Sequence, residues 1–344
     1  MRRTLLAALV VACLTGVSLP ASSGAILVGV GDQNPDSFSN PFFGALGVKQ
    51  TRLITPWNSI TTEPARLDAW MQAARAKGLV PLVAFERARD QSACPMKPCK
   101  APSVGTFIRS FKKFKRKYPW VRNYQPWNEV NSNTQPTGRR PKLAAQYYSA
   151  MRRNCKNCRV VAADILDISN MVKYIRAFKR NVKGPEPLLW GLHNYGDTNR
   201  SRTSGTENMI DVTNGEIWLT ETGGLVRFES QAGREVFKYD EQRAAKSMKQ
   251  MYTIAERFRD RITRIYVYQF QINFAGDRFD AGIVGLDGLP RPSFTAFKNG
   301  KPGVERIKAP RGLSKPKSKT KKKGGSTGDG RQKCIPSPLG GCQG

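Results

Sequence analysis

Two hydrophobic periods alternate along residues 25 to 300. Short apolar runs typical of strands cover residues 26–30, 51–56, 79–85, 122–127, 160–165, 188–193, 217–221 and 263–270. Between them apolar residues recur at the i, i+3, i+4, i+7 spacing of a helix, as in Leu67, Trp70, Met71 and Ala74, a pattern that stops at Gly78. This alternation predicts βα units around a parallel sheet.

The number of strands and the length of the chain indicate which class of α/β fold it adopts. About 276 residues suit a single (β/α)₈ TIM barrel, and no G-x-G-x-x-G follows the first strand, as a doubly wound dinucleotide-binding sheet would usually require. We therefore predict one barrel domain over residues 25–300.

The first 24 residues have the composition of a secretory signal peptide. Arg2 and Arg3 precede an apolar run over residues 5–17, and small residues follow. An alternative is a lipid-attachment box that would acylate Cys13, although the apolar run continues past that residue. No later run approaches the roughly 18 apolar residues of a membrane span. We expect a secreted, soluble protein.

Positive charge is concentrated at the far end of the chain. Of the net +31, residues 301–344 carry twelve Lys or Arg against Glu305 and Asp329, and the signal carries two arginines, which leaves about +19 for the barrel. The Lys-, Pro-, Gly- and Ser-rich composition of 301–344 predicts a disordered tail, because it offers little apolar surface to bury. The tail would contact an anionic cell wall or acidic polysaccharide, or would simply be solvated. No motif supports nucleic-acid binding, and we expect a monomer.

Six cysteines remain once the signal is removed. They are Cys94, Cys99, Cys155, Cys158, Cys334 and Cys342. An even number in a secreted chain predicts local disulfides, with Cys334 and Cys342 closing a small loop in the tail. A zinc site built from the first four is the alternative, but the barrel would place one pair after strand three and the other before strand five, at opposite ends.

The polar residues that carry chemistry lie where predicted strands end. Glu129 follows the fourth strand, His193 ends the sixth, and Glu221 ends the seventh. In a barrel these ends meet at one face. Two carboxyl groups across that face suit glycosidic-bond cleavage, which needs a proton donor on one side of the sugar and a carboxylate on the other. Either glutamate alone would more often be an ordinary strand-end acid paired with a Lys or Arg.

The segments "QPWNEVN", "GLHNYGD" and "WLTETGG" resemble signatures of the clan A glycoside hydrolases. The resemblance covers most of residues 25–300, including "TRLITPWN" and "FDAGIVGLDGLPRPSFTAF". Families 39 and 5 and the plant and fungal type of glucanase catalytic core are the nearest in character. The clan is a superfamily of retaining (β/α)₈ enzymes, so the resemblance implies a retaining glycosidase.

Roles follow from this resemblance residue by residue. Glu129 would be the general acid/base and Glu221 the nucleophile. Asn128 would hydrogen-bond the sugar 2-hydroxyl, while Arg52 and Tyr195 would hold Glu221 ionised and oriented. His193 would contact the substrate or the acid/base. The chain departs from its relatives at Val130, where many have proline, and at Phe270, which would replace the tryptophan that floors the sugar site.

The roles of other residues near strand ends are less closely defined by the sequence. Trp57 and Trp127, like Trp190, could be core fillers or sugar platforms, and Gln269 on the eighth strand is a candidate for substrate binding. Asp164 and Glu86 are expected to be structural or subsite residues.

The sequence therefore predicts a secreted retaining glycosidase that acts on a β-linked polysaccharide or oligosaccharide without metal or cofactor. With a single histidine and no G-x-S-x-G or H-E-x-x-H motif, a serine triad and a zinc hydrolase are excluded. The alternative is a catalytically inactive barrel that serves as a carbohydrate or cell-wall binding module.

Overall fold

The computed structural model describes residues 25–230 and 232–300, so the predicted signal peptide and tail, with Cys13, Cys334 and Cys342, lie outside the described residues. Nine parallel strands form the main sheet, in the order β5-β4-β3-β2-β1-β11-β8-β7-β6. They are β1 (Leu27–Gly31), β2 (Gln50–Pro56), β3 (Val80–Glu86), β4 (Asn123–Gln125), β5 (Arg159–Val160), β6 (Asp164–Leu166), β7 (Leu189–His193), β8 (Glu216–Thr222) and β11 (Ile262–Tyr268).

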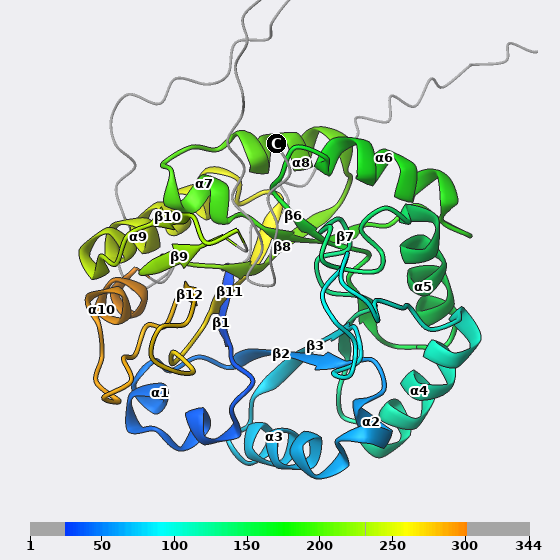
Figure 1. The fold of residues 1–344 in the computed structure, drawn as a ribbon, viewed down its shortest axis with the longest axis horizontal. Helices are drawn as coiled ribbons and strands as arrows, with labels where there is room; N and C mark the ends of the chain where they lie inside the picture. Colours follow the sequence, from blue (N-terminus) through cyan, green and yellow to red (C-terminus); the bar gives the residue numbers. More distant parts are fainter. Residues whose placement is uncertain (1–24, 231, 301–344) are drawn as a thin grey trace, which may run out of the picture.

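The sheet curls into a ring through the segment that contains β5 and β6. β5 pairs with β4, and β6 pairs with β7. Between them, the amide of Val161 donates to the Tyr124 carbonyl on one side, and the amide of Ala162 donates to the Leu189 carbonyl on the other. The two short strands therefore act as one interrupted fifth strand, and the predicted eight-position TIM barrel is confirmed (Figure 1).

Helices cover the outside of this ring (Figure 1). They are η1 (Pro35–Ser39), α1 (Pro41–Ala45), α2 (Ser59–Thr62), α3 (Pro64–Ala76), α4 (Val104–Lys117), α5 (Pro141–Arg153), α6 (Met171–Asn181), α7 (Tyr195–Asn199), α8 (Ser204–Val212), α9 (Glu241–Arg257) and α10 (Pro292–Asn299).

Helix α4 shows why these segments become amphipathic outer helices. The Ser103 side chain caps its first turn by accepting from the Thr106 amide, which satisfies a backbone donor that the helix leaves open. Phe107, Phe111 and Phe114 lie on one face and are buried against the barrel. Ile108 and Ser110 are also buried, and most of the other positions are Lys or Arg.

A second, three-stranded sheet lies in the loops that follow β8 and β11. It consists of β10 (Glu235–Phe237), β9 (Arg227–Glu229) and β12 (Phe279–Asp280) in that order. Phe228 and Phe279 of this small sheet form a separate apolar cluster with Tyr195, whose ring contacts Phe279 edge-on at 5.2 Å. The small sheet thus fixes an aromatic residue that belongs to the site.

The interior of the barrel changes character along its axis. Leu82, Trp218 and Tyr266 belong to an apolar layer. Higher up, Gly191 on β7 leaves room for a polar layer, because a β-carbon there would lie 2.8 Å from Asp164 Oδ1, 2.8 Å from Thr220 Oγ1 and 2.9 Å from Gln125 Nε2. Among the described residues, no helix has the length and apolar character needed to cross a membrane.

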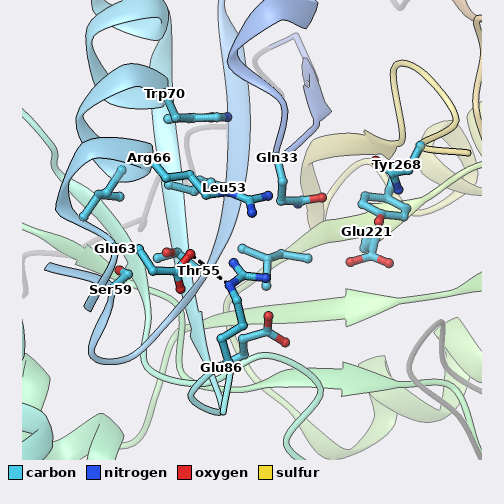
Figure 2. A pocket seen from close by; sticks show the side chains of 14 residues that line it. Gln33, Leu53, Thr55, Ser59, Glu63, Arg66, Trp70, Glu86, Glu221 and Tyr268 are labelled. Carbon is cyan, nitrogen blue, oxygen red and sulfur yellow. Dashed lines mark hydrogen bonds and ion pairs between the residues drawn. The ribbon is translucent and has the colours of Figure 1, made fainter. Parts of the chain in front are cut away.

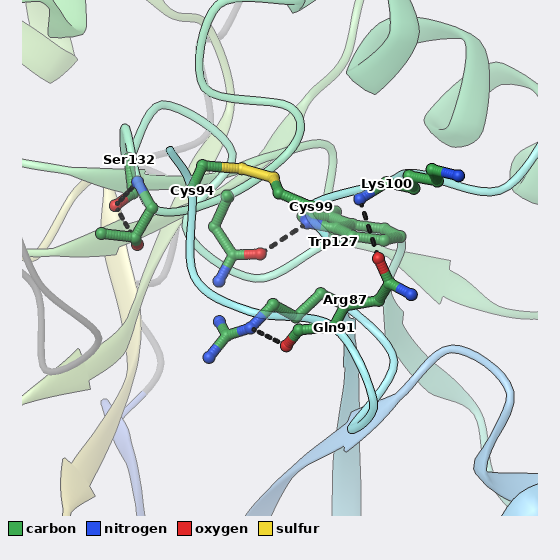
Figure 3. The surroundings of a disulfide bond; sticks show 9 residues. Arg87, Gln91, Cys94, Cys99, Lys100, Trp127 and Ser132 are labelled. Carbon is green, nitrogen blue, oxygen red and sulfur yellow. Dashed lines mark hydrogen bonds between the residues drawn. A yellow bond between two sulfur atoms is a disulfide. The ribbon is translucent and has the colours of Figure 1, made fainter. Parts of the chain in front are cut away.

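The four described cysteines form two local disulfides, Cys94–Cys99 and Cys155–Cys158. This confirms the predicted local pairing and shows that the alternative of a four-cysteine zinc site is wrong. The first disulfide closes a loop after β3 that lies beside Trp127 (Figure 3). The Cys94 amide donates to the Thr134 carbonyl, which ties this loop to the one after β4.

Candidate active site

Glu129 and Glu221 approach one another at the end of the barrel where the strands finish. Glu221 is on β8, whereas Glu129 lies in the turn after β4, and both are almost completely buried. Glu129 has a φ of +46°, a left-handed conformation that costs a non-glycine residue about 1 kcal/mol. One oxygen of Glu129, one of Glu221 and one nitrogen of His193 all lie within 4.8 Å of one another.

Arg52 binds Glu221 and three polar residues beside it. Projecting from β2, it is 1% exposed and donates to Glu221 Oε2 at 2.7 Å, Asp164 Oδ2 at 2.6 Å and Asn128 Oδ1 at 2.7 Å. It also donates to Gln125 Oε1 at 3.1 Å. Burial alone would lower the pKa of Arg52, but the negative charges of Asp164 and Glu221 raise it, so the guanidinium stays charged.

His193 at the end of β7 bridges three carboxylates. Its Nε2 lies 2.9 Å from Asp164 Oδ2 and 3.7 Å from Glu221 Oε2, and its Nδ1 lies 3.2 Å from Glu129 Oε1. Burial would lower the pKa of His193, yet the charges of Asp164 and Glu221 raise it to about 10. An imidazolium donates from both nitrogens, which matches a ring with a carboxylate at each end.

Asp164 connects the two cations. It accepts from Arg52 and His193 through Oδ2 and from the Thr220 hydroxyl through Oδ1. Burial would raise its pKa, but the positive charges of His193 and Arg52 hold it well below the usual value. Asp164, expected to be structural or part of a subsite, thus belongs to the charged cluster itself.

Tyr195 completes the surroundings of Glu221. Its hydroxyl donates to Glu221 Oε1 at 3.0 Å, opposite the oxygen held by Arg52. Burial and the neighbouring Glu221 charge raise the pKa of this hydroxyl well above its usual value, so it remains a donor. Both Glu221 oxygens are therefore fixed in position.

A cavity of about 390 Å³ opens beside Glu221 (Figure 2). Tyr268 at the end of β11 lines it next to Glu221, and Gln33, Arg66 and Trp70 line the part toward α3. Its wall is completed by Leu53, Ile54, Thr55, Ser59, Glu63, Leu67, Glu86, Arg89 and Asn273. The cavity combines an aromatic ring with several polar groups, as carbohydrate-sized ligand sites do.

Glu86 at the end of β3 is the most unusual group in this wall. Its Oε2 is buried and has no hydrogen-bond partner among the described residues. Burial raises the pKa of Glu86 to about 7, the Arg87 charge opposes that rise, and the Glu129 charge adds to it. Near neutral pH this carboxyl therefore holds a proton for much of the time and has unused hydrogen-bonding capacity.

Of the tryptophans expected to be core fillers or sugar platforms, Trp127 is a core filler, and its place among the substrate-binding residues is corrected. Trp127 is fully buried, stacks on Tyr147 at 5.3 Å and donates through Nε1 to Gln135. Trp57 packs against the main apolar core and is not among the residues that line the cavity. The Trp127 ring therefore presents no face to a substrate, whereas Trp57 is partly buried beside the core.

Phe270 is corrected for a different reason. β11 ends at Tyr268, after which the amide of Gln271 donates to Asp32, so the chain no longer follows the strand direction. Phe270 is buried against Phe43, with ring centroids 5.2 Å apart. Tyr268 is the strand-eight aromatic residue that lines the cavity.

Gln269 is buried immediately behind this wall. Its Oε1 accepts from Asn273 at 3.2 Å, and Asn273 lines the cavity. Strand-end position alone could not separate Gln269 from Asn273, which lies in the following loop, nor identify Arg66 on α3.

The three ligand atoms of Glu129, His193 and Glu221 have spacing that could suit a metal ion. Their surroundings do not fit one, because Arg52 already places a positive charge 2.7 Å from Glu221. A metal ion would also have to displace a proton from His193, whose pKa is raised by the charges of Asp164 and Glu221.

A (β/α)₈ barrel with two buried glutamates at the ends of its fourth and seventh strand positions has the architecture of a glycosidase. The family model described as "Glycosyl hydrolase catalytic core" matches residues 89–289, more than half of the 344 residues. The chain belongs to this family, and the matched range contains both glutamates. The predicted relationship to glycoside hydrolases is confirmed at the level of this catalytic-core family.

Solved structures share the fold at low sequence identity. An endo-1,4-beta-xylanase from Caldicellulosiruptor owensensis is 12% identical with a TM-score of 0.56, over 80% of this chain and 97% of that one. The GH5_18 protein from Streptomyces cattleya is 13% identical, with a TM-score of 0.55, over 80% and 79%. A family 39 glycoside hydrolase from Bacteroides cellulosilyticus is 13% identical with a TM-score of 0.53.

The last alignment covers 81% of this chain but only 64% of the family 39 enzyme. No curated protein matches the sequence. At these identities the structural likeness shows the fold, and the details of activity must be argued from the residues of the site.

Proposed function

We propose that the protein is a retaining glycoside hydrolase that cleaves a β-linked polysaccharide or oligosaccharide through two glutamates. The observation that carries this proposal is the separation of the acids, because an oxygen of Glu129 and an oxygen of Glu221 lie within 4.8 Å. Retaining enzymes have carboxyl groups about 5–5.5 Å apart, whereas inverting enzymes leave roughly 6.5–9.5 Å for a water molecule.

Glu221 is the proposed nucleophile. Arg52 and Tyr195 hold its two oxygens through hydrogen bonds of 2.7 Å and 3.0 Å. Glu221 also lines the cavity, so its carboxylate can reach a sugar bound there. In the first step it bonds to the anomeric carbon as the glycosidic C–O bond breaks.

Glu129 is the proposed general acid/base. Its Oε1 lies 3.2 Å from His193 Nδ1, one of its oxygens lies within 4.8 Å of an oxygen of Glu221, and we assign to it the proton that the leaving group needs. Glu129 gives this proton to the leaving oxygen. In the second step it takes a proton from the water that attacks the anomeric carbon and releases Glu221.

Other side chains bind and orient. Asn128 Oδ1 accepts from Arg52, which orients its amide NH₂ as the donor to the sugar 2-hydroxyl. Tyr268 offers its ring to the sugar, and the Glu86 carboxyl offers a hydrogen bond to a hydroxyl group deeper in the cavity.

A mechanism-based 2-fluoro glycoside tests the proposal. After a polysaccharide panel identifies the sugar, the matching 2-fluoro compound should add one glycosyl group per chain, on the peptide that contains Glu221. The Glu221→Gln variant should take up none, and NMR should find products with the starting anomeric configuration. Inverted products, or labelling of another residue, would refute the double-displacement mechanism.

Export is the second part of the proposal. Two disulfides favour an oxidising compartment, and residues 1–24 have signal-peptide character. Expression in a host with a secretory pathway, followed by N-terminal sequencing of the protein in the medium, should find cleavage near residues 21–25. Retention of residues 1–20 on the exported protein would contradict this prediction.

A further inference from the structure

Three consecutive outer helices carry a concentration of positive charge that the active site does not use. Helix α4 contains six Lys or Arg, α5 contains three and α6 contains four, whereas none of the three contains Asp or Glu. By contrast, α8 and α9 carry Glu207, Asp211, Glu241 and Glu256. We call the solvent-exposed side chains of α4, α5 and α6 the basic face.

Most charges of the basic face lack an acidic partner among the described residues. Two salt bridges reach it, from Lys117 to Asp68 and from Lys179 to Glu186, each at 2.5 Å. Arg176 and Arg180 are one helical turn apart, as are Lys112 and Arg116, and these spacings place like charges side by side. Such repulsion is relieved when an external polyanion approaches.

The basic residues of α5 lie at its two ends, with Lys142 in the first turn and Arg152 and Arg153 in the last, so α4 and α6 carry most of the basic face. Figure 1 shows α4, α5 and α6 as neighbours along one side of the ring, with α5 between the other two. A cavity of about 560 Å³ adjoins its end, lined by Arg176, Lys179, Arg180 and Arg261 together with Asp211. An anionic polymer could therefore lie across the three helices and place one charged group in this cavity.

The types of side chain on the basic face indicate which class of polyanion it suits. Large exposed apolar residues occur elsewhere in the described chain, for example at Met96, Leu188 and Phe274, but not on these three helices. The basic face thus lacks an apolar wedge for a lipid bilayer and an exposed aromatic ring for stacking a nucleic-acid base. Positive charge without these features fits a hydrophilic polymer.

We propose that the basic face binds a carboxylate-bearing polysaccharide, a polyuronate. The choice of a polysaccharide rests in part on the proposed glycosidase function, whereas the binding itself does not require turnover. Bound in this way, the polymer holds the enzyme while the cavity beside Glu221 remains open to substrate.

Binding to polygalacturonate in about 50 mM NaCl tests this proposal on the full-length chain. The variant Lys112→Gln/Lys113→Gln/Arg176→Gln/Arg180→Gln should bind about tenfold more weakly or worse than the wild type. The matched control Lys77→Gln/Lys246→Gln/Lys249→Gln/Lys298→Gln also loses four exposed positive charges and should change the affinity less than about twofold. Both variants keep residues 301–344, whose contribution therefore cancels.

Equal weakening by both variants, or no weakening by either, would overturn the proposal. Tighter binding to duplex DNA or to phosphatidylserine vesicles, lost in the first variant but not in the control, would overturn the choice of polyuronate. Circular dichroism checks that each variant is folded. Glu221→Gln should bind polygalacturonate like the wild type, which separates this proposal from the failure or success of the proposed hydrolysis.

Discussion

The charged cluster inside the barrel and the basic face on its outside differ in how their positive charges are paired. Arg52 and His193 are buried, and each contacts carboxylates at hydrogen-bond distance. Arg176 and Arg180 are exposed and have no acidic partner among the described residues. A buried charge without a partner costs several kcal/mol, whereas water and salt screen an exposed one. The interior therefore fixes its charges in pairs, and the surface can leave them available to an external ligand.

The largest effect should come from the paired acids of the interior. Glu221→Gln and Glu129→Gln should each lower kcat by about 10³-fold or more, because each removes a proposed reacting group that water replaces poorly. The exposed Glu235→Gln is the matched control and should leave kcat within about twofold. Turnover near the wild-type level in either active-site variant would show that this acid is not catalytic.

The same contrast predicts that replacing a buried arginine lowers the stability of the protein more than replacing an exposed one. Arg52→Gln should lower the free energy of unfolding by about 3–5 kcal/mol, because it leaves Asp164 and Glu221 buried without their cation. Arg89→Gln removes a salt bridge to Glu63 from an exposed side chain and should cost less than about 1 kcal/mol. Urea denaturation measures both, and equal losses would contradict the pairing argument.

The pH dependence of stability should identify His193 as a buried cation. Its pKa rises from 6.5 to about 10 on folding, so its contribution is fully present below pH 6.5 and disappears as the pH rises toward 10. The difference in unfolding free energy between the wild type and His193→Gln should shrink across this window by roughly 2 kcal/mol or more. A difference independent of pH would mean that His193 is neutral in the folded protein.

Glu86 should show the opposite sign. A carboxyl whose pKa rises from 4.5 to about 7 on folding destabilises the protein increasingly as the pH rises through that interval. The wild type should therefore lose about 2–3 kcal/mol relative to Glu86→Gln between pH 4.5 and 7. Glu216→Gln is the control, because the pKa of Glu216 is lowered and its contribution changes in the other direction.

The smallest effect should come from the basic face. Lys112→Gln/Lys113→Gln should change the free energy of unfolding by about 0.5 kcal/mol or less, with any change toward higher stability at low salt. Thermal unfolding at two salt concentrations measures this. A loss of 2 kcal/mol would show that these lysines have structural partners.

The barrel could be predicted from the sequence because each strand is a distinct apolar run. Only the fifth differs in detail, since Val161 and Ala162 bond to opposite neighbours and divide the run into β5 and β6. Glu129 and Glu221 were predictable for a related reason, since strand ends converge in this fold. Their positions needed no knowledge of loop conformation.

The cavity wall could not be predicted in the same way. Arg66 enters it from α3, and Asn273 enters it from the loop after β11, so neither has a strand-end position to mark it. Trp127 and Phe270 have such positions, yet both rings are buried among helices and loops. Aromatic identity predicts burial as readily as sugar binding, and only the path of the chain separates the two.

Gly191 limits how this enzyme could be altered. The space of its missing side chain is filled by Asp164, Thr220 and Gln125, so even one added methyl group would press on the layer that supports Arg52. In an evolving or redesigned lineage, position 191 would therefore accept almost no mutation, while the cavity wall around Arg66 and Asn273 could vary widely. New substrate preferences should therefore arise from mutations in the cavity wall, while the polar layer inside the barrel stays unchanged.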